Sequence, residues 1–107
     1  MTVFEVGIWV VKPEKQAEFT KLWKRFLKYL KENPKMFKEL KSIKLFTQTL
    51  GGITGAYVEL AEYDSLADYE KLNKRTLKDA GYMKLFQEFM LIIDPATLTS
   101  SVMNFVM

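Results

Sequence analysis

The sequence predicts an α+β fold with the element order β-α-β-β-α-β, in a single domain over residues 1–107. Three observations indicate this fold. A β-branched and aromatic segment at residues 3–11 is followed at once by a helical pattern with apolar residues three and four apart. Two further strand-like segments flank a glycine-rich turn in the middle of the chain. A second helical region then leads into a last strand.

The first predicted strand, Val3 to Val11, is apolar on both faces. Alternation along a strand puts Phe4, Val6, Ile8 and Val10 on one face, and Val3, Glu5, Gly7, Trp9 and Val11 on the other. Only Glu5 and Gly7 interrupt the apolar character of the second set. A strand with one solvated face alternates apolar and polar residues. This strand therefore needs a covering layer on each side.

The first predicted helix runs from Glu14 to Leu30. Pro13 ends the strand before it, because proline donates no ladder hydrogen bond and suits the first turn of a helix. One apolar stripe follows the helical period, made of Phe19, Leu22, Trp23, Phe26 and Leu30. The stripe predicts that this helix covers one face of the sheet. Asn33-Pro34 ends it, and residues 35–41 are expected to form a short helical or turn segment.

The second and third strands are predicted at Ser42 to Leu50 and at Gly55 to Tyr63. The glycine-rich connection between them predicts a hairpin loop, because no Gly-Lys-Ser/Thr follows it as a phosphate-binding loop requires. Alternation in the third strand puts Ala56, Val58, Leu60 and Glu62 on one face, and Tyr57, Glu59, Ala61 and Tyr63 on the other.

The second helix is predicted to begin at Leu66 with Asp64 or Ser65 as its cap, and to end near Leu77. Ala80-Gly81 breaks or bends it, and a further helical stretch runs from about Tyr82 to Asp94-Pro95. The last strand is predicted at residues 98–106. This order is that of a ferredoxin-like fold, an antiparallel four-stranded sheet with its helices on one face.

The sheet face without helices is expected to be covered by a second copy of the chain. We assign Tyr57, Ala61 and Tyr63 to this face, together with one apolar set of the first strand. Burying about 500 Å² of it at ~25 cal/mol per Å² contributes on the order of 10 kcal/mol before the cost of association. We therefore expect a homodimer, or a higher oligomer built from it.

The absence of cysteine and histidine restricts the chemistry. No disulfide, thiolate nucleophile, Cys-ligated metal or Ser-His-Asp triad can form, and the usual haem and zinc ligand is missing. We accordingly expect no cofactor and no metal site. No apolar run approaches the ~20 residues of a membrane span and no secretory signal is visible. We expect a cytoplasmic protein without a membrane partner.

Charge is distributed unevenly along the chain. Residues 1–53 hold eleven Lys and Arg against five Asp and Glu, and residues 54–107 hold five against eight. Only two of the basic residues are arginines, and the helix aromatics belong to the core stripe, so we expect solvated charged faces and no nucleic-acid partner.

Two segments carry a resemblance to a known group of proteins. Val10-Val11-Lys12-Pro13-Glu14-Lys15-Gln16-Ala17-Glu18-Phe19 resembles the strand-to-helix segment of the dimeric α+β barrel superfamily, often Val-Lys-Pro-Gly-Lys-x-x-x-Phe, with Glu14 in place of the frequent Gly. Residues 63–70 resemble the junction between the third strand and the second helix in two branches of this superfamily, the antibiotic-biosynthesis-monooxygenase-like and the NIPSNAP-like branch. Residues 86–95 are similar to the NIPSNAP-like branch in particular.

The resemblance implies a homodimer whose sheets pack face to face, with a pocket in each subunit between sheet and helices. The superfamily includes cofactor-independent monooxygenases, haem-dependent enzymes and isomerases. The haem-dependent members use a His ligand that this chain lacks. No family site residue maps onto this sequence residue by residue.

Glu5 and Glu59 are candidate catalytic residues. If their strands are neighbours, the two carboxyl groups share one side of the sheet and could divide acid and base roles between them. The alternative is that each meets a lysine such as Lys44 across the strands, or a polar position in the dimer seam.

Trp9, Tyr57, Tyr63 and Asn104 are candidate pocket residues, because the rings could stack on a flat aromatic ligand and the amide could hydrogen-bond it. Ordinary packing is the alternative for the rings, and an edge position for Asn104. Two functions remain open. The first is a monooxygenase-like enzyme, or a binder, that takes a small apolar or aromatic molecule into the sheet–helix pocket. The second is a non-catalytic homo-oligomeric module.

Overall fold

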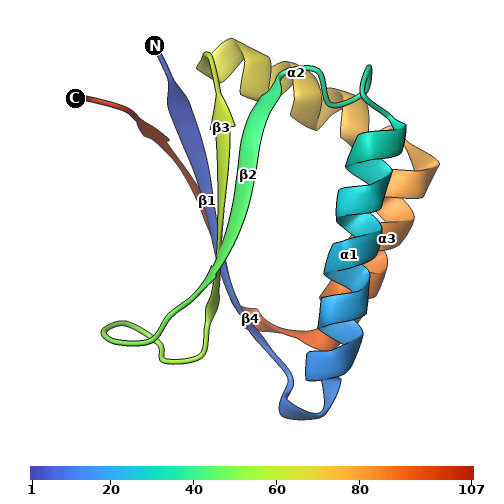
Figure 1. The fold of residues 1–107 in the computed structure, drawn as a ribbon, viewed down its shortest axis with the longest axis vertical. Coiled ribbons are helices and arrows are strands. Elements are labelled where there is room, and N and C mark those ends of the chain that lie inside the picture. Colours follow the sequence, from blue (N-terminus) through green and yellow to red (C-terminus); the bar gives the residue numbers. More distant parts are fainter.

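A computed structural model describes residues 1–107 and shows a four-stranded antiparallel sheet with three helices on one face (Figure 1). The strand order is β2-β3-β1-β4. The strands are β1 (Val3–Val11), β2 (Leu40–Thr47), β3 (Tyr57–Tyr63) and β4 (Ile93–Asn104). The predicted α+β, ferredoxin-like fold is confirmed, with its second helical region divided in two.

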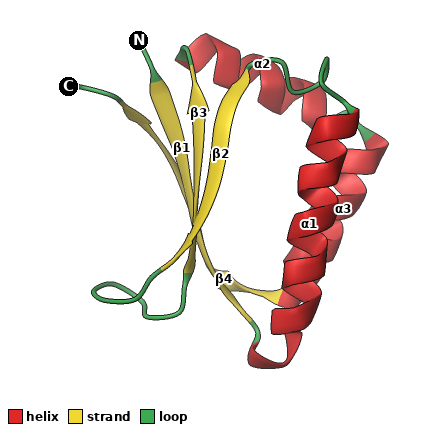
Figure 2. Ribbon diagram, in the orientation of Figure 1, coloured by secondary structure: helices red, strands yellow, loops and turns green.

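The helices are α1 (Gln16–Glu32), α2 (Leu66–Thr76) and α3 (Ala80–Ile92). A short 3₁₀ turn, Pro13–Lys15, precedes α1. Helices α1 and α3 run side by side along the sheet, whereas α2 crosses one end of it (Figure 2). The predicted cap of α2 is confirmed, since the Ser65 hydroxyl accepts a hydrogen bond from the Asp68 amide at 3.1 Å. None of the helices combines the length and hydropathy needed to cross a bilayer.

The hairpin strands are shorter at the turn than predicted. Gly51, Gly52 and Gly55 all adopt positive φ, so residues 48–56 form a loop rather than the end of one strand and the start of the next. At its other end β2 begins two residues early, at Leu40.

Strand β4 begins at Ile93, well before the predicted start at residue 98. The chain passes from α3 directly into the strand, and Pro95 lies inside it. Proline has no backbone N–H to donate to a neighbouring strand, and the β1–β4 register shifts between Ile8 and Val10. At this shift the Val10 amide donates to the Thr97 hydroxyl at 2.9 Å.

The assignment of Tyr57, Ala61 and Tyr63 to the helix-free face is wrong. In the β1–β3 register these residues lie opposite Trp9, Glu5 and Val3, on the side that the helices cover. Ala61 and Tyr63 are buried in a cluster beneath α2, and Tyr57 packs on Trp9 and Phe19. Because β1 is apolar on both faces, its pattern does not tell which face the helices take.

The sheet face away from the helices is apolar at its centre. By register its apolar residues are Phe4, Val6, Ile8, Val10, Phe46, Val58, Leu60 and Met103, and its polar residues are Ser42, Lys44, Glu62, Asp94, Thr99 and Ser101. In Figure 1 no helix lies over this side of the sheet, and at one end of it Phe105 packs edge to face on Phe4. We call it the open face.

Two buried clusters make up the core. One surrounds Trp9, Phe19 and Ile93 under α1 and α3, and the other surrounds Val3 and Tyr63 at the α2 end. Along β1 these clusters are separated by the stretch that holds Glu5 and Gly7. The core is therefore interrupted by a carboxyl group at mid-sheet.

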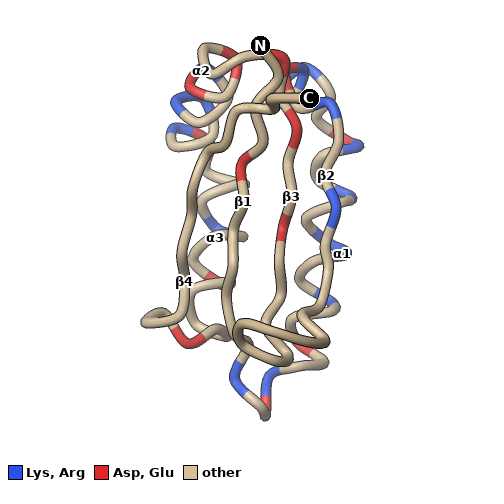
Figure 3. The backbone as a smooth tube through the Cα atoms, turned by 90° about the vertical axis from the view of Figure 1, so that its left-hand side faces the viewer, with Lys and Arg blue, Asp and Glu red and all other residues tan.

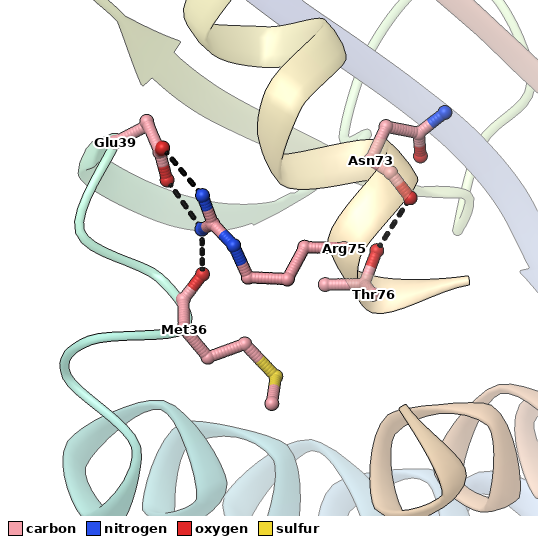
Figure 4. A network of polar contacts seen from close by, with 5 residues as sticks. All are labelled: Met36, Glu39, Asn73, Arg75 and Thr76. Atoms are coloured by element: carbon pink, nitrogen blue, oxygen red, sulfur yellow. Dashed lines mark hydrogen bonds and ion pairs between the residues drawn. The ribbon is translucent and has the colours of Figure 1, made fainter. Parts of the chain in front are cut away.

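A bidentate ion pair attaches α2 to the turn between α1 and β2. Arg75 donates to both carboxylate oxygens of Glu39 at 2.7 and 2.8 Å and to the Met36 carbonyl at 2.6 Å (Figure 4). The Glu39 side chain is only 8% exposed, and the guanidinium lowers the pKa of its carboxyl. The contact fixes the α2 end of the core.

Candidate functional site

A cavity of about 290 Å³ lies between the sheet and helices α1 and α3. Its wall is aromatic and aliphatic on the helix side, and its polar groups come from the sheet and from Tyr82. It is lined by Glu5, Gly7, Trp9, Phe19, Leu22, Trp23, Phe26, Glu59, Tyr82, Leu85, Phe86, Phe89, Leu98, Thr99 and Ser100. An engineered cavity of about 150 Å³ admits benzene. This one has room for a molecule of two or three fused rings.

Glu5 and Glu59 lie on the floor of this cavity. The register pairs Glu5 with Ala61 and Gly7 with Glu59, so the two carboxyl groups stand diagonally across β1 and β3 on the helix-covered side. Both are half-buried. In Figure 3 acidic residues mark the middle of both central strands, whereas the basic residues lie along α1 and at the outer edges.

The two carboxyl groups perturb each other. The pKa of Glu59 is raised to about 8, mainly by burial and in smaller part by the charge of Glu5 and a hydrogen bond to it. Burial also raises the pKa of Glu5, but hydrogen bonds from Tyr69 and Glu59 act against the rise. Of the two carboxyl groups, Glu59 therefore holds its proton more strongly, and Glu5 is the one that ionises first.

Three tyrosines surround the carboxyl pair. Tyr63 and Tyr69 line a second, smaller cavity of about 60 Å³, and Glu5, Glu59, Phe26 and Tyr82 line both cavities. Burial and the nearby carboxylates raise the pKa of Tyr69 and of Tyr82 to about 12, and raise the pKa of Tyr63 as well. These hydroxyl groups are thus protonated and available as hydrogen-bond donors.

Trp9 forms one wall of the cavity and is 2% exposed. Its ring stacks on Tyr57 and meets Phe89 edge to face, with ring centroids 5.0 Å apart. Its indole N–H is buried and has no hydrogen-bond partner within the chain. A buried indole N–H usually has a partner, so this unpaired donor is an exception among the buried polar groups of the chain.

The structure brings together Glu5, Glu59 and Trp9 from the predicted set, with Tyr63 at the back of the carboxyl pair. Tyr57 lies behind Trp9 and donates its hydroxyl to Gln16 at 3.1 Å, outside the cavity lining. Asn104 is exposed at the far end of β4 and lies away from both cavities.

The alternative that each glutamate meets a lysine is wrong, and both glutamates lie on the helix-covered side of the sheet, not on the open face. Lys44 pairs with Leu60 and so points to the open face, and neither glutamate takes part in an ion pair. No group of three or more acidic side chains is placed to hold a metal ion.

Tyr69 and Tyr82 are the site residues that sequence reasoning missed. Tyr69 falls within the predicted second helix, and Tyr82 at the predicted start of the last helical stretch. Aromatic residues in such helices are typical of an ordinary core. Only the packing of α2 and α3 against the sheet places both hydroxyl-bearing rings beside the glutamates.

The fold recurs in several solved structures. A NIPSNAP family protein from Agrobacterium tumefaciens superposes with a TM-score of 0.75 at 15% sequence identity, covering 97% of this chain and 92% of the other. A NIPSNAP domain protein from Burkholderia xenovorans gives 0.73 at 13% identity, with 97% and 94% covered. A variant of SnoaB, a cofactor-independent oxygenase from Streptomyces nogalater, gives 0.68 at 14% identity, with 97% and 92% covered.

The comparison with curated proteins gave no match. At the identities above, the structural similarities show a common fold. Family membership is shown by a separate comparison, in which the NIPSNAP family model matches residues 4–97. The resemblance of residues 10–19 and 63–70 to the dimeric α+β barrel proteins is confirmed in its NIPSNAP-like branch, and the chain belongs to the NIPSNAP family.

Proposed function

We propose that the protein binds a small, flat, largely apolar molecule in the 290 Å³ cavity and removes a proton from it, as a cofactor-independent oxygenase-like enzyme does. The observation that carries the proposal is the Glu5–Glu59 pair, which forms the polar floor of an otherwise aromatic cavity. Apolar pockets with a few convergent polar groups and perturbed pKa values are typical of active sites.

Each carboxyl group has a role in this reaction. Glu5, as the carboxylate, is the base that takes a proton from a carbon or oxygen next to an aromatic ring. Glu59, as the acid, donates a hydrogen bond to the oxygen on which negative charge develops. Tyr82 stands beside both groups as a further donor.

The resulting carbanion can react with molecular oxygen without a cofactor. For a CH₂ group between two aromatic rings, two C–H bonds are lost and the carbon becomes a carbonyl. One oxygen atom of O₂ enters the product and the other leaves as water, so atoms and electrons balance. The structural similarity to SnoaB supports this class of reaction.

Oxygen uptake with anthrone tests the proposal, since anthrone plus O₂ gives anthraquinone plus water. We expect enzyme-dependent uptake that Glu5→Gln lowers at least tenfold. Binding is followed separately by the fluorescence of Trp9 and Trp23, which both line the cavity. Glu70→Gln, an exposed change on α2, is the matched control. If anthrone and naphthalene-sized probes leave the fluorescence unchanged, the cavity is not a ligand site.

We also propose that the protein forms a homodimer through the open face. The support is the run of half-buried or exposed apolar side chains on β1 and β3, including Val6, Ile8, Val58 and Leu60. Monomeric proteins rarely leave so large a contiguous apolar surface in water. A dimer formed there would leave the 290 Å³ cavity, on the opposite side of the sheet, free for a ligand.

A further inference from the structure

The carboxyl pair has no positive counter-charge anywhere in its surroundings. No lysine or arginine lines either cavity. The ionic pairs of the chain all lie elsewhere, on its surface or at the Arg75–Glu39 contact. The polar groups of the surrounding elements are all uncharged. β3 and α3 contribute the hydroxyls of Tyr63 and Tyr82, α2 contributes Tyr69, Asn73 and Thr76, β4 contributes Thr99 and Ser100, and α1 and β2 contribute only apolar side chains.

Phe26 and Tyr82 are the aromatic residues that line both cavities beside the pair. Their ring centroids are 6.4 Å apart at 63°. Trp23 and Phe86 continue the aromatic wall from there. Aromatic faces attract a cation, most strongly where water is excluded.

An anion fits this cavity poorly, because it would meet Glu5 and find no positive group. A neutral ligand leaves the carboxylate charge of Glu5 uncompensated in a largely apolar site. A cation compensates that charge and also contacts the rings. Two carboxyl groups on one side and aromatic rings on the other are the chemistry that recognises an ammonium group.

We propose that the ligand of this cavity is an amine on a flat apolar body, bound as its ammonium cation between the Glu5–Glu59 pair and the rings of Phe26 and Tyr82. The inference rests on the proposed function in one respect, that the ligand occupies this cavity. It adds the charge of the ligand and names the groups that recognise it. With an ammonium ligand Glu59 becomes a carboxylate, so the hydrogen-bond donor of the proposed reaction is then Tyr82 and no longer Glu59.

Proton release is a consequence of this binding mode. In the free protein Glu59 holds a proton near neutral pH. An ammonium group beside it favours the ionised carboxylate, so binding expels that proton. The affinity for the amine should accordingly rise with pH toward about 8, the pH at which Glu59 of the free protein is half ionised.

Three probes with one naphthalene body test the proposal: 1-naphthylmethylamine, 1-naphthalenemethanol and 1-naphthoic acid. We expect the amine to bind at least tenfold more tightly than the alcohol at pH 7, and the acid to bind most weakly. Calorimetric titration of the amine in two buffers of different ionisation enthalpy should show release of up to one proton. Glu59→Gln should abolish the proton release, and the exposed Glu70→Gln should leave it unchanged.

The outcomes separate this inference from the proposed function. Equal or tighter binding of the alcohol overturns the ammonium assignment and leaves an aromatic ligand site in place. Tighter binding of the amine without proton release shows that the cation does not sit beside Glu59, and also overturns it. If none of the three probes binds, the cavity is not a ligand site and both proposals fail.

Discussion

The six-membered ring of Trp9 lies over Gly7, two residues earlier on the same strand. A Cβ atom at Gly7 would lie 3.3 Å from Cζ3 of this ring, which is tighter than an ordinary van der Waals contact. The absence of a side chain at Gly7 therefore lets the indole lie flat on β1. It also keeps open the part of the cavity floor next to Glu59, whose Cβ lies 3.9 Å from the same point.

Adding a side chain at Gly7 should disturb both the Trp9 ring and the cavity. We expect Gly7→Val to destabilise the protein by about 1–3 kcal/mol, as overpacked cores do, although valine suits a strand. Gly7→Ala should have a smaller effect in the same direction. Urea unfolding measures the stability, and quenching of tryptophan fluorescence by 1-naphthalenemethanol measures the cavity. Unchanged probe binding by Gly7→Val would show that the ring does not move into the cavity.

The stability of the protein should fall as the pH rises. The pKa of Glu59 is raised from its ordinary 4.5 to about 8 in the folded protein, so the folded state binds the proton more tightly than the unfolded chain. The stabilisation is full below pH 4.5 and is lost as the pH rises through about 8. The loss from this group is on the order of a few kcal/mol. The raised pKa of Glu5 acts in the same direction.

Glu59→Gln tests this directly, because glutamine keeps the shape of the protonated acid. We expect the variant to be more stable than the parent at pH 8.5 and close to it at pH 5, measured as the free energy of unfolding in urea at both pH values. Glu62→Gln, on the same strand but the opposite face, is the control for the substitution itself. A difference between parent and Glu59→Gln that does not vary with pH would contradict the assignment.

Much of this fold could be predicted from the sequence, because the relevant signals are local. The stripe from Phe19 to Leu30, the cap at Ser65 and the apolar first strand each follow from neighbours along the chain. The face of β3 could not be assigned in this way. Both faces of β1 are apolar, so only the packing of α1 and α3 decides which one is covered.

The candidate site could be predicted only where its residues give a local signal in the sequence. Glu5 and Glu59 interrupt strands that are otherwise apolar on that face, which marks them in the sequence. Tyr69 and Tyr82 give no such signal, since aromatic residues on the inner side of a helix are ordinary core residues. Their place beside the glutamates depends on contacts between distant parts of the chain.

Gly81 should not tolerate a side chain. A Cβ atom there would lie 2.8 Å from Cζ of Tyr29, whose hydroxyl donates to the Asp79 carboxylate that caps α3. Alanine is the better helix former by about 1 kcal/mol, yet we expect Gly81→Ala to destabilise the protein by about 1–3 kcal/mol because α1 and α3 would be forced apart. Ala80 is exposed, so Ala80→Gly serves as the control for helix propensity. A Gly81→Ala variant as stable as the parent in urea would contradict the close contact.

The two bidentate Arg–Glu pairs should differ in how much they stabilise the folded protein. Arg75 holds a Glu39 side chain that is 8% exposed, whereas both partners of the Arg25–Glu88 pair are more than one-third exposed, at 50% and 39%. Solvent-exposed pairs contribute little, and removing one partner of a buried pair leaves an unpaired charge. We therefore expect Arg75→Met to lower the unfolding temperature by several degrees and Arg25→Met to change it little. Equal effects of the two substitutions would contradict this ranking.

The proposed dimer makes its own prediction at the open face. Leu60 lies opposite Val6 in the middle of this face, so Leu60→Lys would place a charge at the centre of the contact between the two sheets. We expect the parent to have the mass of a dimer in sedimentation equilibrium and Leu60→Lys that of a monomer. The control is Leu91→Lys, the same change at a position that is 71% exposed on α3.

A parent protein that sediments as a monomer would contradict the dimer, and a dimeric Leu60→Lys would place the contact on another surface. Ligand binding by the variant shows whether the cavity depends on the dimer, because the cavity and the open face lie on opposite sides of the sheet. A folded Leu60→Lys monomer should therefore still bind 1-naphthalenemethanol. If it does not, the shape of the cavity depends on the second copy of the chain, and assembly and binding are coupled through β1 and β3.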